Sequence, residues 1–474
     1  MSKGTRLHPA AIFFNFIKVL RESIFALVLG FITFKGDSFF YFILVASILL
    51  LMLLVYSALS WYRYTYRIED EELRIEYGIF IRKKRFISKN RIQSIDLTAG
   101  IIHRIFKLTK VQIETAGTGT GAEASLKAVK TAEGERLRTE LKAAKIPTVN
   151  SIEEAPKTDH PSAKITFKCL FIAGSTSGGI GVIFALLAFV FSEVEQFIPE
   201  RFYDNTIEWV VGLSILFLIG LIIIFLILGW VLGIAGTVIK YGNFTITKNY
   251  DELFITRGLL EKKQLTIPLK RVQAVGIQES IIRQPLGYVT VFAEVAGGSM
   301  DKGEDFSTVL FPIMKKDEVV DFLEKFLPTH AAGAKDITPL PKRARKFYLL
   351  RSVLPMLIIA GGIVYFLPQF SWVPIVLVAG SLYLGFLRHN AGGYQLDGDR
   401  LMIRYRVLNK ITMIMYHKRI QAFEKSQHMV HRSQKLASMQ ISIIGKFGVG
   451  KHYKLRELEE KDVDYLSDWY SYRS

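Results

Sequence analysis

Long uncharged stretches alternate along the chain with stretches of mixed polarity. Four of them contain no Asp, Glu, Lys or Arg: residues 39–59, 169–192, 209–239 and 352–387. A bilayer core of ~30 Å needs roughly 20 apolar helical residues. The first two stretches therefore predict one membrane span each. The third is long for one span and is expected to tilt. The fourth is long enough for two, with Pro368 and Pro374 between them.

A further apolar stretch near the N-terminus, residues 11–34, is interrupted by Lys18, Arg21 and Glu22. We interpret it as a retained first helix, which brings the prediction to six transmembrane helices in three hairpins. Ionisable residues inside a span are candidates for function by default. An interfacial helix that leads into a short span is the simpler interpretation of these three.

The charges beside the spans predict the orientation. The short turns hold two basic and six acidic residues: Lys35, Arg201, Asp37, Glu193, Glu195, Glu200, Asp204 and Glu208. The other helix ends hold Arg63, Arg67, Lys164, Lys168, Lys240, Lys342, Arg343, Arg345, Lys346 and Arg388. Because loops rich in Lys and Arg stay on the cytoplasmic side, we expect a multi-pass protein of the cell membrane. Both termini and all large soluble segments would then be cytoplasmic.

The soluble segments repeat one another. Arg91 opens "RIQSI", Arg271 opens "RVQAV" and Arg419 opens "RIQAF". Around these motifs, residues 66–117, 246–297 and 394–445 align without a gap, at offsets of 180 and 148. The sequence therefore predicts three homologous domains, each preceded by a helical hairpin.

Each copy has the pattern of a β-domain. Short runs of alternating Ile, Tyr, Phe and Val are separated by turn signals, and a charged amphipathic helix follows the last strand. This order predicts a small, mainly antiparallel barrel or sandwich with a C-terminal helix. The expected boundaries are hairpins at 1–62, 165–240 and 347–388, domains at 63–145, 241–328 and 389–474, and flexible linkers at 146–164 and 329–346.

The pattern "Y-x-I-x-x-x-x-L-x-I-x-x-G-I-F" followed by "RIQSI" resembles the bacterial pleckstrin-homology domain, and the triple arrangement resembles the YdbT-like membrane proteins. The resemblance implies a pleckstrin-like barrel for each copy and a link to the cell envelope and its stress or antimicrobial responses. The third copy departs from the pattern. Arg406 stands where the others have Gly78 and Gly258, so a turn that needs positive φ would have to be rebuilt there.

The repeated motif has two interpretations, which concern Arg91, Gln93, Arg271, Gln273, Arg419 and Gln421. In the structural one, the arginine pairs with a carboxylate or carbonyl and fixes strand register, while the glutamine satisfies neighbouring backbone. In the functional one, the arginine belongs to a basic mouth that receives a phosphate or a partner's carboxylate. We favour the structural interpretation, because the motif is repeated together with its apolar positions.

The strand before the motif is a better candidate binding surface. Its basic residues are Arg82, Lys83, Lys84 and Arg85 in the first copy, Lys262 and Lys263 in the second, and Lys410 in the third. By resemblance to pleckstrin domains, these positions would contact anionic lipid headgroups. Each basic residue near an anionic leaflet contributes ~1 kcal/mol. The alternative is a solvated strand face.

Composition narrows the chemistry. The net charge of +18, on a chain half apolar, indicates cytoplasmic loops and anionic headgroups rather than nucleic acid. One cysteine, Cys169, allows no intrachain disulfide. His428 and His431 in "HMVH" lack acidic or cysteine partners at ligand spacing, and His431 aligns with His103 and Arg283. We expect no enzyme, no metal and no cofactor.

The sequence therefore predicts a non-catalytic scaffold that binds partner proteins or anionic lipid, with oligomerisation allowed. The alternative is a transporter or lipid-handling protein in which the helices form the pathway and the domains gate or assemble it. A transporter usually shows midplane charges and interrupted helices in its corresponding halves. Here only Lys18, Arg21, Glu22, Pro355 and the pair Gly361–Gly362 offer such features.

Overall fold

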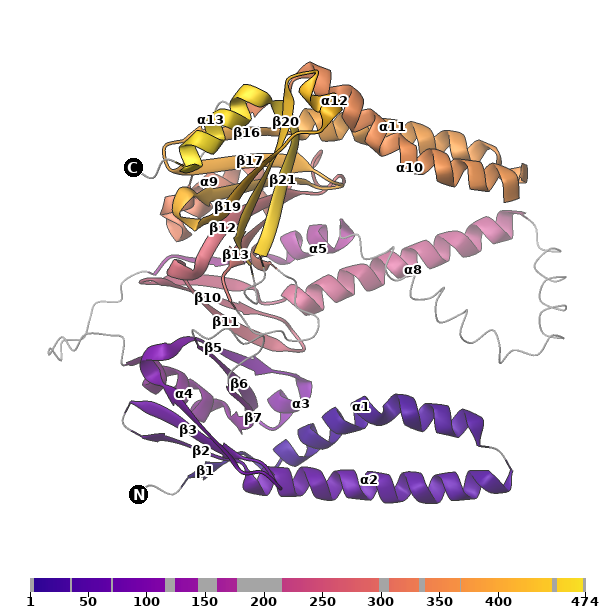
Figure 1. The fold of residues 1–474 in the computed structure, drawn as a ribbon. Helices are drawn as coiled ribbons and strands as arrows, with labels where there is room; N and C mark the ends of the chain where they lie inside the picture. The colour runs from indigo at the N-terminus through magenta and orange to yellow at the C-terminus, as the bar shows by residue number, and fades with distance from the viewer. Residues whose placement is uncertain are drawn as a thin grey trace, which may run out of the picture. The chain divides into compact units, whose positions relative to one another are not determined.

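The computed structural model describes residues 4–34, 36–69, 71–115, 124–143, 160–176, 215–297, 307–331, 337–366, 368–445 and 450–471. The chain divides into two compact units (Figure 1). The first comprises Met1–Asp159 and Leu260–Pro268, and the second comprises His160–Leu259 and Leu269–Ser474. One strand from the second repeat therefore belongs to the unit built by the first.

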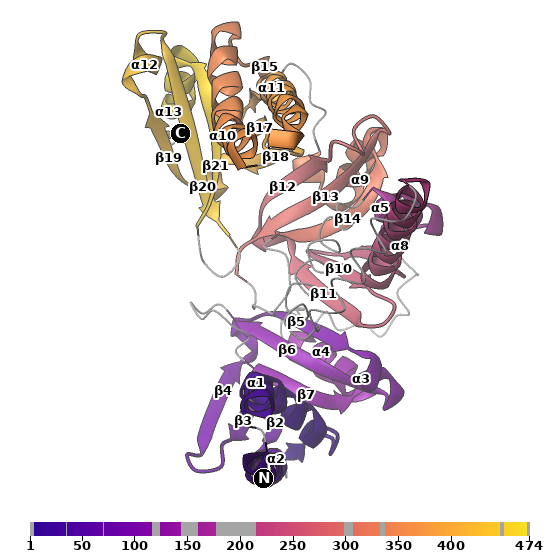
Figure 2. The same ribbon diagram turned by 90° about the vertical axis from the view of Figure 1, so that its right-hand side faces the viewer.

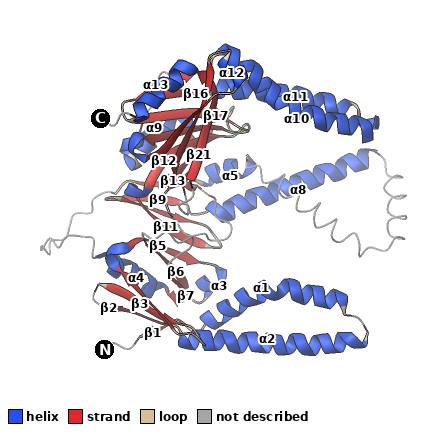
Figure 3. Ribbon diagram, in the orientation of Figure 1, coloured by secondary structure: helices blue, strands red, loops and turns tan. Residues whose placement is uncertain are grey.

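The described elements follow one order in every repeat: a short strand, a hairpin of helices, three strands, a 3-10 turn, three more strands and a helix (Figure 3). The first repeat contains β1 (Thr5–Arg6), α1 (Ala11–Thr33), α2 (Asp37–Arg63), β2 (Thr65–Glu69), β3 (Glu72–Tyr77), β4 (Lys83–Ser88), η1 (Lys89–Arg91), β5 (Ile92–Ala99), α3 (Ile101–Ile105), β6 (Leu108–Thr115), β7 (Ala124–Lys130) and α4 (Thr131–Ala143).

The second repeat contains β8 (Ser162–Lys164), α5 (Phe167–Ser175), α8 (Ile215–Tyr241), β9 (Thr245–Asn249), β10 (Glu252–Arg257), β11 (Lys262–Pro268), η2 (Leu269–Arg271), β12 (Val272–Glu279), β13 (Tyr288–Val295), β14 (Thr308–Lys315), η3 (Lys316–Glu318), α9 (Val319–Phe326) and η4 (Pro328–His330).

The third repeat contains β15 (Thr338–Pro339), η5 (Lys342–Ala344), α10 (Arg345–Phe366), η6 (Pro368–Phe370), α11 (Trp372–Ala391), β16 (Gly393–Asp397), β17 (Arg400–Arg406), β18 (Lys410–Tyr416), η7 (His417–Arg419), β19 (Ile420–Ser426), α12 (Met429–Arg432), β20 (Leu436–Ile444), β21 (Gly450–Glu459) and α13 (Glu460–Ser471). The last residues of both predicted linkers are thus ordered, since β8 and β15 pair with β9 and β16.

The alternating apolar positions form the cores, as the strand pattern predicts. In the first repeat, Leu73 and Ile95 lie with Leu137 of α4 in one buried cluster. In the third, Leu401 and Ile441 lie with Leu466 of α13. Each of these cores is therefore two small sheets closed off by the amphipathic helix.

Three described helices are long and apolar enough to cross a membrane: Ser38–Arg63, Lys342–Phe366 and Trp372–Ala391. Leu226–Tyr241 is a shorter apolar helix. No residue in the most apolar window of Ser38–Arg63 is buried, as expected for a surface that faces lipid. Within the described residues, three of the six predicted spans are thus found, and α1, which carries Lys18, Arg21 and Glu22, is not among them. The predicted span 169–192 and the beginning of 209–239 lie mostly outside the described residues.

The resemblance implies a barrel for each copy, and the described strands do not form closed barrels. In the first unit, β5 pairs with β6 on one side and with β11, a strand from the second repeat, on the other. In the second unit, β12 pairs in the same way with β13 and with β18 of the third repeat. We count the strands of each repeat from the one that follows the hairpin. The fourth strand (β5 or β12) thus pairs with the third strand of the next repeat (β11 or β18), and the sheet continues instead of closing.

Both of these strand junctions have the same register. At the first, Lys262 lies opposite Ala99. At the second, Lys410 lies opposite Glu279, and these two residues are the repeat equivalents of the first pair at offsets of 148 and 180. Because a slip of one residue would turn every side chain to the opposite face, an identical register indicates one specific pairing mode used twice.

The turn between the third and second strands of each repeat follows the prediction made for Arg406. Gly78 and Gly258 have φ of +106° and +101°. A Cβ on Gly78 would lie 2.0 Å from the carbonyl oxygen of Ile81. In the third repeat, β17 runs on to Arg406, which pairs with Lys410 in a tighter turn. The turn is therefore rebuilt where glycine is replaced.

A buried ion pair marks the second junction. Lys410 Nζ lies 2.9 Å from Glu279 Oε1, and the two side chains are 13% and 7% exposed. Lys316 lies 3.7 Å from the same oxygen. Burial lowers the pKa of Lys410, and the hydrogen bond to Glu279 opposes this shift. The lysine therefore bonds the junction internally and is not presented to headgroups.

We expect Lys410→Met to lower the free energy of unfolding by about 3 kcal/mol, because it removes the cation that hydrogen-bonds the buried carboxylate of Glu279. The measurement is chemical or thermal unfolding of the full chain in detergent. Lys262→Met is the matched control: this exposed equivalent faces Ala99, so its change should stay within about 0.5 kcal/mol. The exchange Lys410→Glu with Glu279→Lys should recover stability. Equal effects of both methionine variants would contradict the role of the ion pair.

Candidate functional site: a basic strand and the helix contacts

The turns between the third and second strands lie beside the ends of the hairpin helices. In the second repeat, Leu259 N donates to Ile239 O of α8 at 3.0 Å. In the third, Arg388 Nε of α11 donates to Val407 O at 2.8 Å. In the first, Tyr77 at the end of β3 stacks on Tyr64, which follows α2, with ring centroids 6.1 Å apart. The turn after β3 therefore lies near the end of an apolar helix.

This first-repeat turn presents apolar and basic side chains together. Phe80 is 92% and Ile81 74% exposed. Arg82 follows directly, with Nη2 2.6 Å from Glu76 Oε2, and Lys83 and Lys84 are exposed at the start of β4. We define Phe80–Arg85 as the basic turn. The apolar pair was missed in the sequence, although its position after the turn glycine and before four cations was a usable signal.

The other predicted basic positions lie at the junctions. Lys262 is exposed and Lys263 half-buried on β11, opposite Ala99 and Thr98. Lys410 is bonded to Glu279, as described above. The seven candidates therefore do not form one surface. Only Arg82 to Arg85 lie together in the basic turn, and Figure 2 shows β4 at the outer edge of its sheet.

The repeated motif sits at the same structural position in all copies. Arg91, Arg271 and Arg419 each end a 3-10 turn, and the fourth strand begins at the next residue. In the second repeat, Arg271 Nε donates to Ala296 O at 2.7 Å, and Gln273 Nε2 donates to Arg271 O at 3.1 Å. A Cβ on Gly297 would lie 2.6 Å from this guanidinium. These contacts favour the structural interpretation of Arg271 and Gln273.

The motif's glutamines differ in burial between copies. Gln273 is buried and Gln93 is half-buried. Gln421 is exposed, and so is Ala422 beside it. The difference accompanies the junctions, because β5 and β12 have a neighbouring strand from the next repeat, whereas β19 is the first strand in the order β19-β20-β21.

One repeated position docks each hairpin onto its domain. In the first repeat this is His103, whose ring stacks on Phe14 of α1 at 3.9 Å. Its Nε2 also lies 3.0 Å from Lys127 O. Lys127 Nζ donates in turn to Asn15 Oδ1 of α1, and burial lowers the pKa of Lys127. The beginning of α1 is thus bound to the β-domain.

The equivalent residue in the second repeat is Arg283, which binds the end of α5. Its Nε donates to Thr176 Oγ1 at 2.8 Å and its Nη2 to Ala173 O at 3.1 Å. Its Nη1 donates to Thr290 Oγ1 of β13 at 2.7 Å. A guanidinium with several fixed donors can satisfy helix carbonyls and a strand hydroxyl together.

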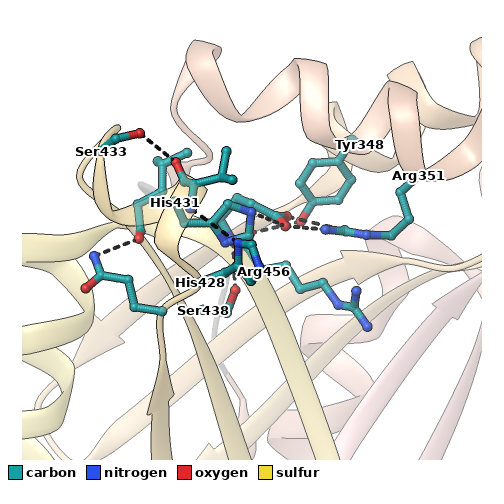
Figure 4. A network of polar contacts seen from close by, with 11 residues as sticks. Tyr348, Arg351, His428, His431, Ser433, Ser438 and Arg456 are labelled. Atoms are coloured by element: carbon teal, nitrogen blue, oxygen red, sulfur yellow. Dashed lines mark hydrogen bonds and ion pairs between the residues drawn. The ribbon is translucent and has the colours of Figure 1, made fainter.

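In the third repeat, His431 belongs to a network between α10 and β21 (Figure 4). Glu457 is fully buried, receives both guanidinium nitrogens of Arg351, and lies 3.6 Å from His431 Nε2. Tyr348 Oη donates to Arg456 O at 3.0 Å. The residue types at this position thus change between repeats, while the contact between helix and domain is kept.

The charged residues of α1 lie near the docking contact of the first repeat, which His103 and Lys127 form. Lys18 and Glu22 are four residues apart, 4.0 Å from each other, with side chains 65% and 60% exposed. Both act on the pKa of Lys127, so they lie close to the β-domain. This arrangement favours the interpretation of the first turns of α1 as interfacial, with Arg21 in the same segment.

His428 has a role in local structure. Its Nδ1 accepts from Val430 N at 3.3 Å at the beginning of α12. Within the described residues, no group of three His, Cys, Asp or Glu side chains is placed to hold a metal ion.

We expect Arg351→Met to destabilise the third repeat by about 3–5 kcal/mol, because it leaves the buried Glu457 carboxylate without its main partner. Arg343→Met is the control, since its pair with Glu459 is exposed and such pairs contribute about 0–1 kcal/mol. The double variant Arg351→Met/Glu457→Gln should recover most of the loss. Thermal unfolding followed by tryptophan fluorescence measures all three. A loss in Arg343→Met as large as that in Arg351→Met would contradict the assignment.

The motif arginine of the third repeat acts on a buried histidine. His330 packs against Tyr416, and burial, then Arg419, Arg400 and Lys418, lowers its pKa to about 4. Its unfolded pKa is about 6.5. The unfolded state therefore binds the proton first as pH falls, and stability is lost between pH 6.5 and about 4, by roughly 3 kcal/mol in full.

His330→Phe should accordingly flatten the pH dependence of the unfolding free energy between pH 6.5 and about 4. Arg419→Gln should make the loss of stability smaller, because removing a neighbouring positive charge raises the native pKa of His330 towards its unfolded value. Urea unfolding across this pH range measures both variants. His160→Phe, at an exposed position, should leave the profile unchanged. An unaltered slope in His330→Phe would refute the role of this histidine.

Comparison with known proteins agrees with the repeat seen in the structure. The family model described as "Bacterial PH domain" matches three times, at residues 23–145, 206–327 and 356–474. The chain is 34% identical, over 489 aligned positions, to "UPF0699 transmembrane protein YdbT" of Bacillus subtilis (strain 168), with 100% of this chain and 99% of the relative covered. The chain is thus a membrane protein with three such domains, and it belongs to the bacterial PH domain family.

Proposed function

We propose that the chain is a non-catalytic scaffold of the cell membrane whose three β-domains form a cytoplasmic binding platform. The observation that carries the proposal is the basic turn, where exposed Phe80 and Ile81 precede four cations beside the end of α2. Aromatic side chains and cations are the residue types that favour the membrane interface. The first repeat would therefore hold the platform against anionic headgroups.

The helix contacts support a scaffold in which the domains have fixed positions on their hairpins. His103, Arg283 and His431 each bind the first helix of their own hairpin or its network. A surface held close to the bilayer experiences the field of anionic lipid within a Debye length of about 10 Å. Firm docking of the hairpins thus favours binding of the basic turn to the membrane surface it adjoins.

The polar residues of α1 offer less support for a transport pathway. Asn15 bonds to Lys127 of the β-domain, and Lys18 pairs with Glu22 in an exposed position. These contacts explain the polar residues of α1 as part of the segment that docks the first hairpin onto its β-domain. Two of the buried carboxylates also fit a scaffold, because Glu279 is bonded to Lys410 at a junction and Glu457 to Arg351 in a docking network.

We expect the basic turn to be protected by anionic lipid. In nanodiscs that hold one copy each, hydrogen exchange at residues 78–88 should be about tenfold slower with phosphatidylglycerol than with phosphatidylcholine, since each cation contributes ~1 kcal/mol. Lys83→Glu/Lys84→Glu should abolish the difference. The matched control Lys454→Glu/Lys461→Glu, which reverses two exposed lysines of the third repeat, should keep it.

Equal exchange in the two lipids for the unchanged chain would refute headgroup binding by this turn. Purification from native membranes with mass spectrometry then tests the remaining part of the proposal. A protein recovered in stoichiometric amount and lost with Lys83→Glu/Lys84→Glu would make the basic turn a protein-binding surface.

A further inference from the structure

Two strands, β4 and β19, lie at the ends of their described sheets, at the positions that form junctions in the other repeats. β4 occupies in the first repeat the place that β11 and β18 occupy at the junctions, and β19 occupies in the third repeat the place of β5 and β12. β4 is the last strand in the order β1-β2-β3-β4, and β19 is the first in the order β19-β20-β21. Within the part of the chain that the structure describes, each therefore has a strand neighbour on one side.

The exposure of the side chains agrees with open edges in the described part of the chain. Phe86 of β4 is 56% exposed, whereas its equivalents Thr266 and Ile414 are 4% and 0% exposed. Ala422 of β19 is exposed, whereas its equivalents Ser94 and Ala274 are buried. An open edge presents a row of backbone donors and acceptors that another strand can pair with.

We propose that β19 of one copy pairs with β4 of a second copy, so that the chain assembles head to tail in the membrane. The register of the two internal junctions fixes the expected register between copies. Arg85 would lie opposite Glu424, Phe86 opposite Phe423, and Ile87 opposite Ala422. The inference goes beyond the proposed scaffold function and stands without it.

The expected pairs are complementary. Arg85 and Glu424 have opposite charges, and Phe86 and Phe423 make an aromatic pair, which are the cross-strand combinations that stabilise antiparallel sheets. Lys84 would lie opposite Lys425. Lys425 is bonded to Asp464 and lies 3.6 Å from Glu460, so the group that Lys84 meets is acidic as a whole.

A second copy fits these edges better than an unrelated strand does. The third and fourth strands of this family of repeats already pair twice within the chain in a single register. Each repeat carries its own hairpin, so copies in one bilayer present their edges at similar height, and confinement to a plane raises their effective concentration. The two edges differ from each other, so the contact is heterologous and extends to a row or ring.

The test uses the full chain with its one cysteine removed by Cys169→Ser. Two differently tagged forms, one with Lys83→Cys and one with Ser426→Cys, are co-expressed and oxidised in native membranes. These positions are the repeat equivalents of Lys263 and Thr98, which face each other at the first junction. A single chain with Lys263→Cys and Thr98→Cys is therefore the positive control for disulfide formation at this register.

We expect a disulfide product that carries both tags, at least about fivefold more abundant than the product of Lys83→Cys with the register-shifted Glu424→Cys, because off-register partners lie roughly 7 Å further along the strand. In the Lys83→Cys and Ser426→Cys background, Glu424→Arg should reduce the yield about fivefold by repelling Arg85, and adding Arg85→Glu should restore it.

Absence of the two-tag product, while the positive control oxidises, would overturn the proposal. A chain that carries both Lys83→Cys and Ser426→Cys and yields only internally linked monomer would show instead that β19 pairs with β4 of its own chain. Repeating the oxidation in phosphatidylcholine vesicles separates this inference from lipid binding, because strand pairing should persist where anionic lipid is absent.

Discussion

The structure depends on the unsatisfied edge of the fourth strand in each repeat. A strand that pairs on one side leaves every second backbone N–H and C=O without a partner. In the first and second repeats this edge is filled by the third strand of the repeat that follows. Side chains then fix the contact: Thr266 N donates to Asp96 Oδ1 at 3.0 Å at the first junction, and Lys410 bonds Glu279 at the second. The repeats are therefore joined by their backbones, not only by linkers.

A second constraint comes from the helices. Each domain has its own hairpin. A contact between hairpin and domain is therefore found in every repeat. A stacked imidazole, a guanidinium and a buried ion-pair network perform this task in the three copies. The chemistry diverges because each first helix offers different partners: a phenylalanine, the carbonyls of a helix end, and an arginine. Such a contact holds the hairpin on its β-domain whatever the residue type.

The sequence predicted the repeated elements well and their partners poorly. The gapless alignment located the strands from β2 to β6 with their equivalents and the turn that is rebuilt at Arg406, and the amphipathic pattern located the helix that closes each core. The strand before that helix, which is β7, β14 or β21, was not predicted. It did not predict open sheets, because the alternation of Leu73, Ile95 and their equivalents is the same whether a strand pairs within its repeat or with the next one. Lys410 was assigned to a lipid-facing surface for the same reason: its partner Glu279 lies 131 residues earlier. Residues such as Lys18 and Glu22 were ambiguous until Lys127 was placed beside them.

Each of the three copies of the motif begins a strand, and the three strands differ in what lies beside them. The arginine and its 3-10 turn begin the fourth strand in each repeat, and the residues that follow reflect what covers that strand. At the positions where the first repeat has Leu97 and the second Ile277, the third has Lys425. A lysine on an exposed edge discourages indiscriminate strand addition, and its acidic partners Asp464 and Glu460 leave the edge selective for a cationic strand. In this chain, the cationic third strand is β4. In the proposed head-to-tail contact, Lys425 and its acidic partners therefore favour β4 over an unrelated strand.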